Sequence, residues 1–273
     1  PVHGIDEITQ NIGSVRNQGL EFGLQAVPIQ TADFQWDIGG NLSINRNEIV
    51  SLITETTDDV NNRWFIGQPI DVNFGLVFDG IWQEGDDFDG AAQSDAQPGY
   101  ARILDLDGDS AITEDDRTFI GSRIPSFIWG LNNTFTYKNF SLNVFIHGVQ
   151  GITRRNPLAN DNVFTEVRRN TLLREYWTPE NPINTFWAND EEANNRGVSI
   201  YENASFIRLK DVTLTYRFPR ELVERIRLGG LSLYVNGRNL ATITEWTGLD
   251  PELGSQFGIP LQRVMVLGAN VSF

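Results

Sequence analysis

Apolar and polar residues alternate along four stretches of the chain, at residues 140–147, 210–218, 231–239 and 263–273. Successive side chains of a β-strand point to opposite faces, so this period of two predicts strands with one apolar and one polar face. Only Phe145 breaks the first stretch, because it falls among the polar positions. The predicted apolar faces comprise Phe140, Leu142, Val144 and Ile146; Val212, Leu214, Tyr216 and Phe218; Leu231, Leu233 and Val235; and Met265, Leu267, Ala269, Val271 and Phe273. The pattern predicts an all-β protein.

Strand length and connection length distinguish a membrane barrel from a β-sandwich, which shows the same alternation. The predicted strands run to about ten residues, against five or six in most globular proteins, and this length suits a tilted span of a bilayer. A tight reversal at residues 137–140 is followed by the long segment 148–203, and aromatic residues gather near strand ends. These features favour a transmembrane antiparallel β-barrel portion with short turns on one side and long extracellular loops on the other.

A secreted, calcium-stabilised β-sandwich that binds or cleaves polysaccharide is the alternative. A sandwich would bury the apolar faces against a second sheet, whereas a barrel would present them to lipid. The last predicted strand favours the barrel, because an aromatic residue at its end, Phe273, has no purpose in a sandwich.

Charge and composition exclude several classes of protein. The 273 residues carry a formal net charge of -15 without a cluster of Lys and Arg, so we expect no nucleic-acid partner. The absence of Cys excludes a disulfide scaffold and thiolate metal sites. No apolar run reaches the roughly 18 residues of a transmembrane helix, which leaves strands as the way to cross a bilayer. The chain begins without Met or a signal peptide, so we expect a fragment or a processed product.

Residues 105–116, DLDGDSAITEDD, follow the ligand spacing of a calcium-binding loop. Acidic residues at positions 1, 3, 5 and 12 surround a hard cation with oxygen atoms in such loops. Two positions depart from the pattern, since position 6 is Ser110 instead of Gly and position 12 is Asp instead of Glu. The predicted ligands of a structural Ca²⁺ are the side chains of Asp105, Asp107, Asp109 and Asp116 and the carbonyl of Ala111. A solvated acidic turn is the alternative.

The flanks of this loop do not predict the two helices of an EF-hand. Pro98 and Gly99 interrupt the segment before it, and Gly121 and Pro125 interrupt the segment after it. Between residues 84 and 116 the many acidic side chains face a single basic residue, Arg102. We therefore expect the cation to order a long acidic loop, without any switch-like opening.

Catalytic signatures are absent from the sequence. It contains no GxSxG elbow, no HExxH, no phosphate-binding glycine loop and no Cys nucleophile, so we expect no catalytic residues and no enzyme. Trp177, Trp187 and Trp246 lie in predicted external loops, where their rings could stack on the sugar rings of a substrate. Packing of the loops is the alternative role for these rings.

Six segments carry a family resemblance in chain order, from about residue 11 to residue 273. They read NIGSVRNQGLEFGLQ, FDGIWQ, DLDGDSAITEDDRTFIGSRIPSF, FIRLKDVTLTYRFP, LYVNGRNLATITEWTGLDPEL and GANVSF. Together they resemble the C-terminal part of SusC/RagA-type TonB-dependent (TonB-linked) outer-membrane transporters. The resemblance implies that residues 1–273 supply C-terminal strands of a 22-stranded barrel in a bacterial outer membrane, with the N-terminal plug domain absent.

The resemblance also implies a function and partners. Such transporters import oligosaccharides or peptides with energy from TonB, which would act through the absent N-terminal region. A SusD-like surface lipoprotein would cover the outside, and outer-membrane lipid would surround the wall. The final aromatic residue, Phe273, would be the barrel-assembly signal at the periplasmic side.

This orientation assigns each connection to a side of the membrane. Residues 28–32, 138–139 and 217–229 become periplasmic turns, and residues 84–123, 148–203 and 242–262 become extracellular. Expected strands at residues 34–45 and 73–82 would then both run outward, which neighbouring strands of one barrel cannot do. We therefore expect a hidden strand between residues 48 and 70, with residues 63–70 as the best candidate; the alternative is that the turn assignment is wrong.

Overall fold

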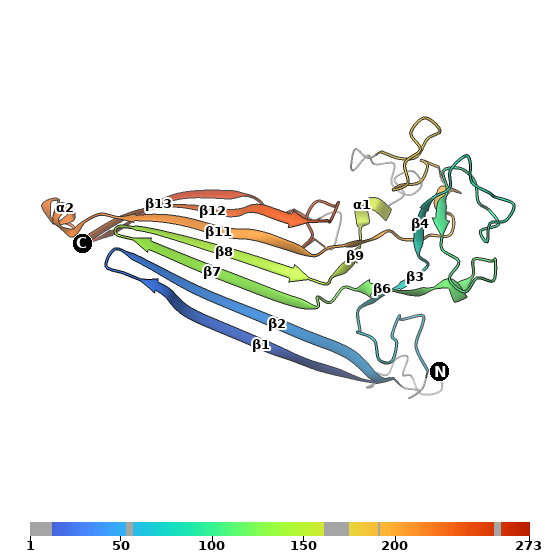
Figure 1. The fold of residues 1–273 in the computed structure, drawn as a ribbon, viewed down its shortest axis with the longest axis horizontal. Coiled ribbons are helices and arrows are strands. Elements are labelled where there is room, and N and C mark those ends of the chain that lie inside the picture. Colours follow the sequence, from blue (N-terminus) through green and yellow to red (C-terminus); the bar gives the residue numbers. More distant parts are fainter. Residues whose placement is uncertain (1–12, 53–56, 161–174, 191, 254–257) are drawn as a thin grey trace, which may run out of the picture.

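The computed structural model describes residues 13–52, 57–160, 175–190, 192–253 and 258–273 (Figure 1). Seven long strands form one antiparallel sheet in the order β1-β2-β7-β8-β11-β12-β13, with β1 and β13 at its edges. Their bounds are β1 Gly13–Gln30, β2 Phe34–Leu52, β7 Phe127–Tyr137, β8 Phe140–Gln150, β11 Phe206–Arg217, β12 Gly230–Thr244 and β13 Val264–Ser272. The four strands predicted from alternation correspond to β8, β11, β12 and β13 and are confirmed.

The strand register aligns apolar residues into rows that cross the sheet. One row joins Trp36, Phe135, Leu142, Leu214, Val235 and Leu267, from β2 to β13. The polar row beside it joins Thr134, Asn143, Thr213 and Asn236. The predicted division of the strands into an apolar and a polar face is therefore confirmed across neighbouring strands.

The apolar face of the sheet is open. Leu267 is 79% exposed, and Leu214, Leu233 and Val235 are also exposed. A β-sandwich would bury such a face under a second sheet, but no element packs on it in the described part of the chain. The sandwich alternative is therefore wrong, and the open face suits lipid contact.

The connections differ in length at the two ends of the sheet (Figure 1). At one end, here called the turn end, the connections are residues 31–33, 138–139 and 218–229, and the C-terminus lies beside them. At the opposite end, the loop end, residues 53–126, 151–205 and 245–263 connect the strands. Helix α2 (Arg220–Arg225) lies within the third turn. The predicted alternation of short and long connections is confirmed.

The expected strand at residues 73–82 does not belong to the sheet. It forms two short strands, β3 (Val72–Gly75) and β4 (Phe78–Ile81), which pair with β6 (Thr118–Ser122) and β5 (Ala101–Ile103). Four residues span only about 13 Å, too short for a bilayer. Because β2 pairs directly with β7, no hidden strand is needed at residues 63–70, and that prediction is wrong. Residues 53–126 are one excursion at the loop end.

The excursions at the loop end have a hydrophobic core of their own. The described parts of residues 57–126 and 151–205, here called the loop cap, contain β9 (Thr153–Arg155), β10 (Tyr201–Asn203), α1 (Pro157–Asn160) and the 3₁₀ turns Glu114–Asp116 and Glu192–Asn194. The buried core consists of Ile81, Ala101, Ile103, Ile112, Trp177, Phe186, Trp187, Ala193 and Val198. None of the helices among the described residues is long and apolar enough to span a membrane.

Candidate functional site: the polar face and the loop cap

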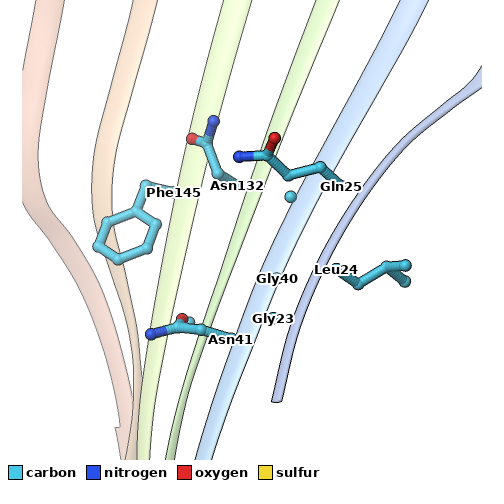
Figure 2. A pocket seen from close by; sticks show the side chains of 9 residues that line it. Gly23, Leu24, Gln25, Gly40, Asn41, Asn132 and Phe145 are labelled. Carbon is cyan, nitrogen blue, oxygen red and sulfur yellow. The ribbon is translucent and has the colours of Figure 1, made fainter. Parts of the chain in front are cut away.

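A hollow of about 660 Å³ lies on strands β1, β2, β7 and β8 (Figure 2). Figure 2 shows the amides of Gln25, Asn41 and Asn132 and the ring of Phe145 projecting from one side of the sheet, while Leu24 projects from the other. Phe145, which interrupts the alternation of its strand, thus lies among polar side chains on the polar face. Its aromatic ring gives the hollow one apolar wall.

Glycines form the floor of this hollow. Gly23, Gly39, Gly40 and Gly130 come from three neighbouring strands. A Cβ atom on Gly130 would lie 2.5 Å from Asn41 Oδ1, whereas one on Gly23 would meet nothing within 4 Å. Glycine weakens a strand and often marks a place where a ligand or another backbone comes close. These glycines are the sequence signal for the hollow, and the alternation of apolar and polar residues does not reveal them.

Hydrogen bonds hold the polar side chains beside the hollow in place. Asn143 donates from Nδ2 to Asn132 Oδ1 at 3.0 Å and to Thr134 Oγ1 at 2.9 Å. One acceptor position of the Asn132 carbonyl oxygen is therefore filled, and its amide nitrogen remains available to a ligand. Among the described residues, no charged side chain lines the hollow. Amide donors and acceptors beside an aromatic ring suit a neutral ligand that has many hydrogen-bonding groups.

A buried ion pair joins the polar face to the connection 245–263. A β-bulge at Lys210 places Arg208 on the polar face of β11, where Nη2 lies 2.8 Å from Asp250 Oδ1. Burial raises the pKa of Asp250, but hydrogen bonds from Arg208 and the backbone N–H of Glu252 outweigh this effect and lower the pKa overall. Glu252 also lies 3.6 Å from Arg208 and 3.8 Å from Lys210. These contacts hold the connection against the sheet.

Three of the predicted calcium ligands converge in the structure. Ligand oxygens of Asp105, Asp107 and Asp109 all lie within 4.8 Å of one another. The backbone N–H of Asp109 lowers the pKa of Asp107, but desolvation and the neighbouring carboxylates outweigh it and raise the pKa overall. Such mutual repulsion is relieved by a bound cation. The three side chains fit the oxygen donor set of Ca²⁺, and calcium binding stays a prediction.

The fourth predicted side chain, Asp116, has a different arrangement. It is buried, and its two carboxylate oxygens accept hydrogen bonds from the backbone N–H groups of Leu106 and Thr113, each at 2.7 Å. These bonds lower its pKa. Asp116 thus closes the loop, and it lies outside the group of three converging carboxylates. The backbone N–H of Ala111 donates to Asp109 at 2.8 Å, while coordination by the Ala111 carbonyl stays a prediction.

Besides Arg102, two basic residues from outside residues 84–116 pair with acids of this loop: Arg117 with Glu114 and Arg196 with Asp95. Arg102 pairs with Asp79 at 3.0 Å and lies 3.8 Å from Asp86. Arg196, from a distant part of the chain, pairs with Asp95 at 2.9 Å and donates to the carbonyl of Ile112 at 3.0 Å. The expectation that these acids face one basic residue was therefore incomplete, because it counted only the basic residues within 84–116.

The three tryptophans proposed for substrate contact are buried. Trp177 and Trp187 belong to the core of the loop cap, where Trp177 donates from Nε1 to Gln83 Oε1 at 2.8 Å and Trp187 stacks on Phe186 at 4.5 Å. Trp246 lies in a second cluster at the base of the cap. None of the three presents an open ring face to solvent, so the structure supports the alternative of loop packing. Substrate contact by these rings stays a prediction without geometric support.

Comparison with known proteins identifies the family. The chain is 31% identical over 303 residues to TonB-dependent receptor P26 of Formosa agariphila, with 99% of this chain and 30% of that protein aligned. It is 27% identical to TonB-dependent receptor SusC of Bacteroides thetaiotaomicron, over 98% of this chain and 27% of that protein. The solved structure of the RagAB peptide transporter superposes with a TM-score of 0.71 at 27% identity, covering 100% of this chain and 31% of that one. No family model matches.

The chain belongs to the SusC/RagA-type TonB-dependent receptors. It spans about 30% of the length of the curated relatives it matches. Proteins of this family are β-barrels of the bacterial outer membrane, so the predicted fold class and location are confirmed. The relatives are named as receptors and transporters rather than enzymes.

Membership of this receptor family indicates what each face of the sheet contacts. The apolar face is the outer surface of the barrel and contacts lipid, while the polar face lines the lumen. The glycine-floored hollow therefore opens into the lumen of a TonB-dependent receptor. Phe273 follows the end of β13 at the turn end and is 97% exposed; its role as an assembly signal stays a prediction.

Proposed function

We propose that the chain forms part of the wall of an outer-membrane active transporter that imports oligosaccharides or peptides. The observation that carries this proposal is the uncharged, glycine-floored hollow on the luminal face. Sugars and peptide backbones both present many neutral donors and acceptors, and both have apolar surfaces that pack on an aromatic ring such as Phe145. The solved structures of RagAB, named as a peptide transporter and a peptide importer, support import as the activity.

The partners follow from the family. TonB would supply energy through a region outside this chain, and a SusD-like lipoprotein would cover the loop end. The loop cap offers that lipoprotein a firm surface, because it is built around its own buried core. A structural Ca²⁺ on Asp105, Asp107 and Asp109 would keep the acidic edge of this surface ordered.

Substitutions in the hollow test the transport proposal in the full-length receptor. Phe145→Ala and Asn132→Ala should each weaken binding of labelled oligosaccharides or oligopeptides, while leaving the barrel folded. Asn133→Ala is the matched control, because Asn133 is the next residue of β7 and lies on the lipid face beside Trp36. A loss of a single stacking contact or amide contact corresponds to about fivefold to tenfold in affinity.

The same measurements decide the substrate class. Loss of oligosaccharide binding alone would assign the hollow to sugars, and loss of oligopeptide binding alone would assign it to peptides. If both luminal variants bind and import every tested compound as well as Asn133→Ala does, the hollow is no substrate site and the observation that carries the proposal fails.

A further inference from the structure

The turn at residues 217–229 carries charge of the opposite sign to the chain as a whole. It contains four arginines and two glutamates, a formal charge of +2, whereas the whole chain has a formal net charge of -15. The basic residues are Arg217, Arg220, Arg225 and Arg227. Such a local excess of positive charge attracts an anionic partner.

Three of these arginines have no acidic partner among the residues that the structure describes. Arg220 pairs with Glu224 at 2.7 Å on the surface of α2. Arg217, Arg225 and Arg227 are exposed, and none of them forms an ion pair with a carboxylate in the described ranges of the chain. Their guanidinium groups are therefore available for a ligand in solution or in the membrane.

Helix α2 also exposes apolar side chains beside these charges. Val223 is buried, whereas Leu222 is 50% exposed and Ile226 is 60% exposed. Leu222 lies in the helix and Ile226 is its C-cap residue. Residues four positions apart are neighbours on a helical surface, so these two exposed side chains form one short apolar stripe. An apolar stripe flanked by arginines is typical of a segment that lies at the surface of a membrane.

The position of α2 agrees with this arrangement. The lipid face ends at the turn end in a cluster of aromatic rings, with Phe140 4.7 Å from Tyr216 and Tyr216 5.0 Å from Phe218. Aromatic rings of this kind mark the level of the lipid headgroups. Because α2 begins two residues after Phe218, it lies next to these rings, at the depth expected for the headgroups.

We propose that residues 217–229 bind an anionic phospholipid in the leaflet at the turn end. Leu222 and Ile226 insert among the first methylene groups of the acyl chains, and Arg225 and Arg227 contact the headgroup. Guanidinium groups bind phosphate oxygens in a bidentate manner. A zwitterionic lipid neutralises its own phosphate, so two unpaired arginines select a headgroup with net negative charge.

Lipid binding to the full-length receptor tests the charge component. Native mass spectrometry in detergent should show short-chain phosphatidylglycerol bound in preference to short-chain phosphatidylcholine. Combining Arg225→Gln and Arg227→Gln should weaken phosphatidylglycerol binding by about fivefold per arginine. The matched control combines Arg46→Gln and Arg63→Gln, which removes the same charge from residues nearer the loop end and should leave binding unchanged.

Two results would overturn the charge component. One is equal binding of the two lipids by the unaltered receptor. The other is displacement of phosphatidylglycerol by millimolar glycerol phosphate, which would assign the arginines to a soluble anion.

Nitroxide labels test the insertion of the apolar stripe in phosphatidylglycerol-containing nanodiscs. Labels on Leu222→Cys and Ile226→Cys should be relaxed by oxygen, which concentrates in lipid, more strongly than by a water-soluble nickel chelate. A label on Glu221→Cys should show the reverse order. If Leu222→Cys and Glu221→Cys respond alike, the stripe does not enter the bilayer and the proposal is wrong. Neither test depends on which substrate the receptor imports.

Discussion

Arg208 and Asp250 form a buried ion pair, with 2.8 Å between Nη2 and Oδ1, that joins strand β11 to the connection 245–263. Removing the carboxylate leaves a buried guanidinium without its principal partner. Asp250→Ala should therefore lower the free energy that holds the connection in place by about 3–5 kcal/mol. Limited proteolysis of this connection measures the effect. Glu252→Gln, at a partly exposed carboxylate 3.6 Å from Arg208, should have a much smaller effect.

The same pair predicts a dependence on pH. The pKa of Asp250 lies below its ordinary value of 3.8. A lowered pKa in the folded state contributes stability that is present above the ordinary pKa and is lost as the pH falls through the folded-state value. Proteolysis of the connection by an acid-active protease should therefore increase only below about pH 4. Asp250→Asn should remove this dependence, and an unchanged pH profile in that variant would contradict the assignment.

The aspartates of the acidic loop should have two different roles, calcium binding and closure of the loop. Asp105→Ala and Asp109→Ala should each weaken calcium binding, because each removes one of three converging carboxylates. Asp116→Ala should instead loosen the loop with and without calcium, since two backbone N–H groups lose their acceptor. The calcium affinity of each variant, measured by calorimetric titration, distinguishes these effects. Glu114→Gln is the control. Metal analysis that finds no calcium after millimolar supplementation would end this prediction.

The two faces of β13 predict different tolerance to charge. Leu267→Arg should lower the free energy of unfolding in lipid by about 2–4 kcal/mol, because it places a charge on the lipid face near the middle of the strand. Asn270→Arg should cost far less, since Asn270 pairs with Ser232 on the luminal face. Unfolding in urea from lipid vesicles gives both values. Equal losses would mean that protein covers both faces of the strand.

Adding one methyl group to the glycine floor should have different effects at Gly23 and at Gly130. Gly23→Ala meets nothing within 4 Å and should raise the free energy of unfolding by about 0.5–1 kcal/mol, because alanine loses less backbone entropy than glycine. Gly130→Ala would place a carbon 2.5 Å from Asn41 Oδ1 and should displace that amide into the hollow. Binding measurements should show reduced substrate affinity for Gly130→Ala. Unchanged affinity would indicate that substrate does not approach this floor.

The sequence predicts the sheet well, because the alternation of side chains is a local property. Leu142 and Leu214 lie 72 positions apart along the chain, yet each could be assigned to the lipid face from its own strand, and the register pairs them directly. Phe145 was the one exception on its strand, and the structure makes it a wall of the luminal hollow. An interruption of a strong pattern was thus informative about the site.

The loop cap was not predictable in the same way, since its order depends on distant contacts. The backbone N–H of Ile81 donates to Asn184, which lies 103 residues further along the chain. Alternation gives no information about such pairs, so β3 and β4 resembled a spanning strand. Burial of Trp177 and Trp187 follows from the same long-range packing. The predicted ligands Asp105, Asp107 and Asp109 converge because their contacts are local.

Both edges of the sheet leave backbone groups without a neighbouring strand. β1 extends over 18 residues and β13 over 9, and neither has a second strand partner among the residues that the structure describes. Open edges of this length are templates for strand addition by other chains. Inside a bilayer, every such group must be satisfied by closure of the barrel. Produced by itself, this chain should therefore form ordered aggregates through β1. Pro substitutions at positions of β1 whose backbone N–H points away from β2 should suppress these aggregates.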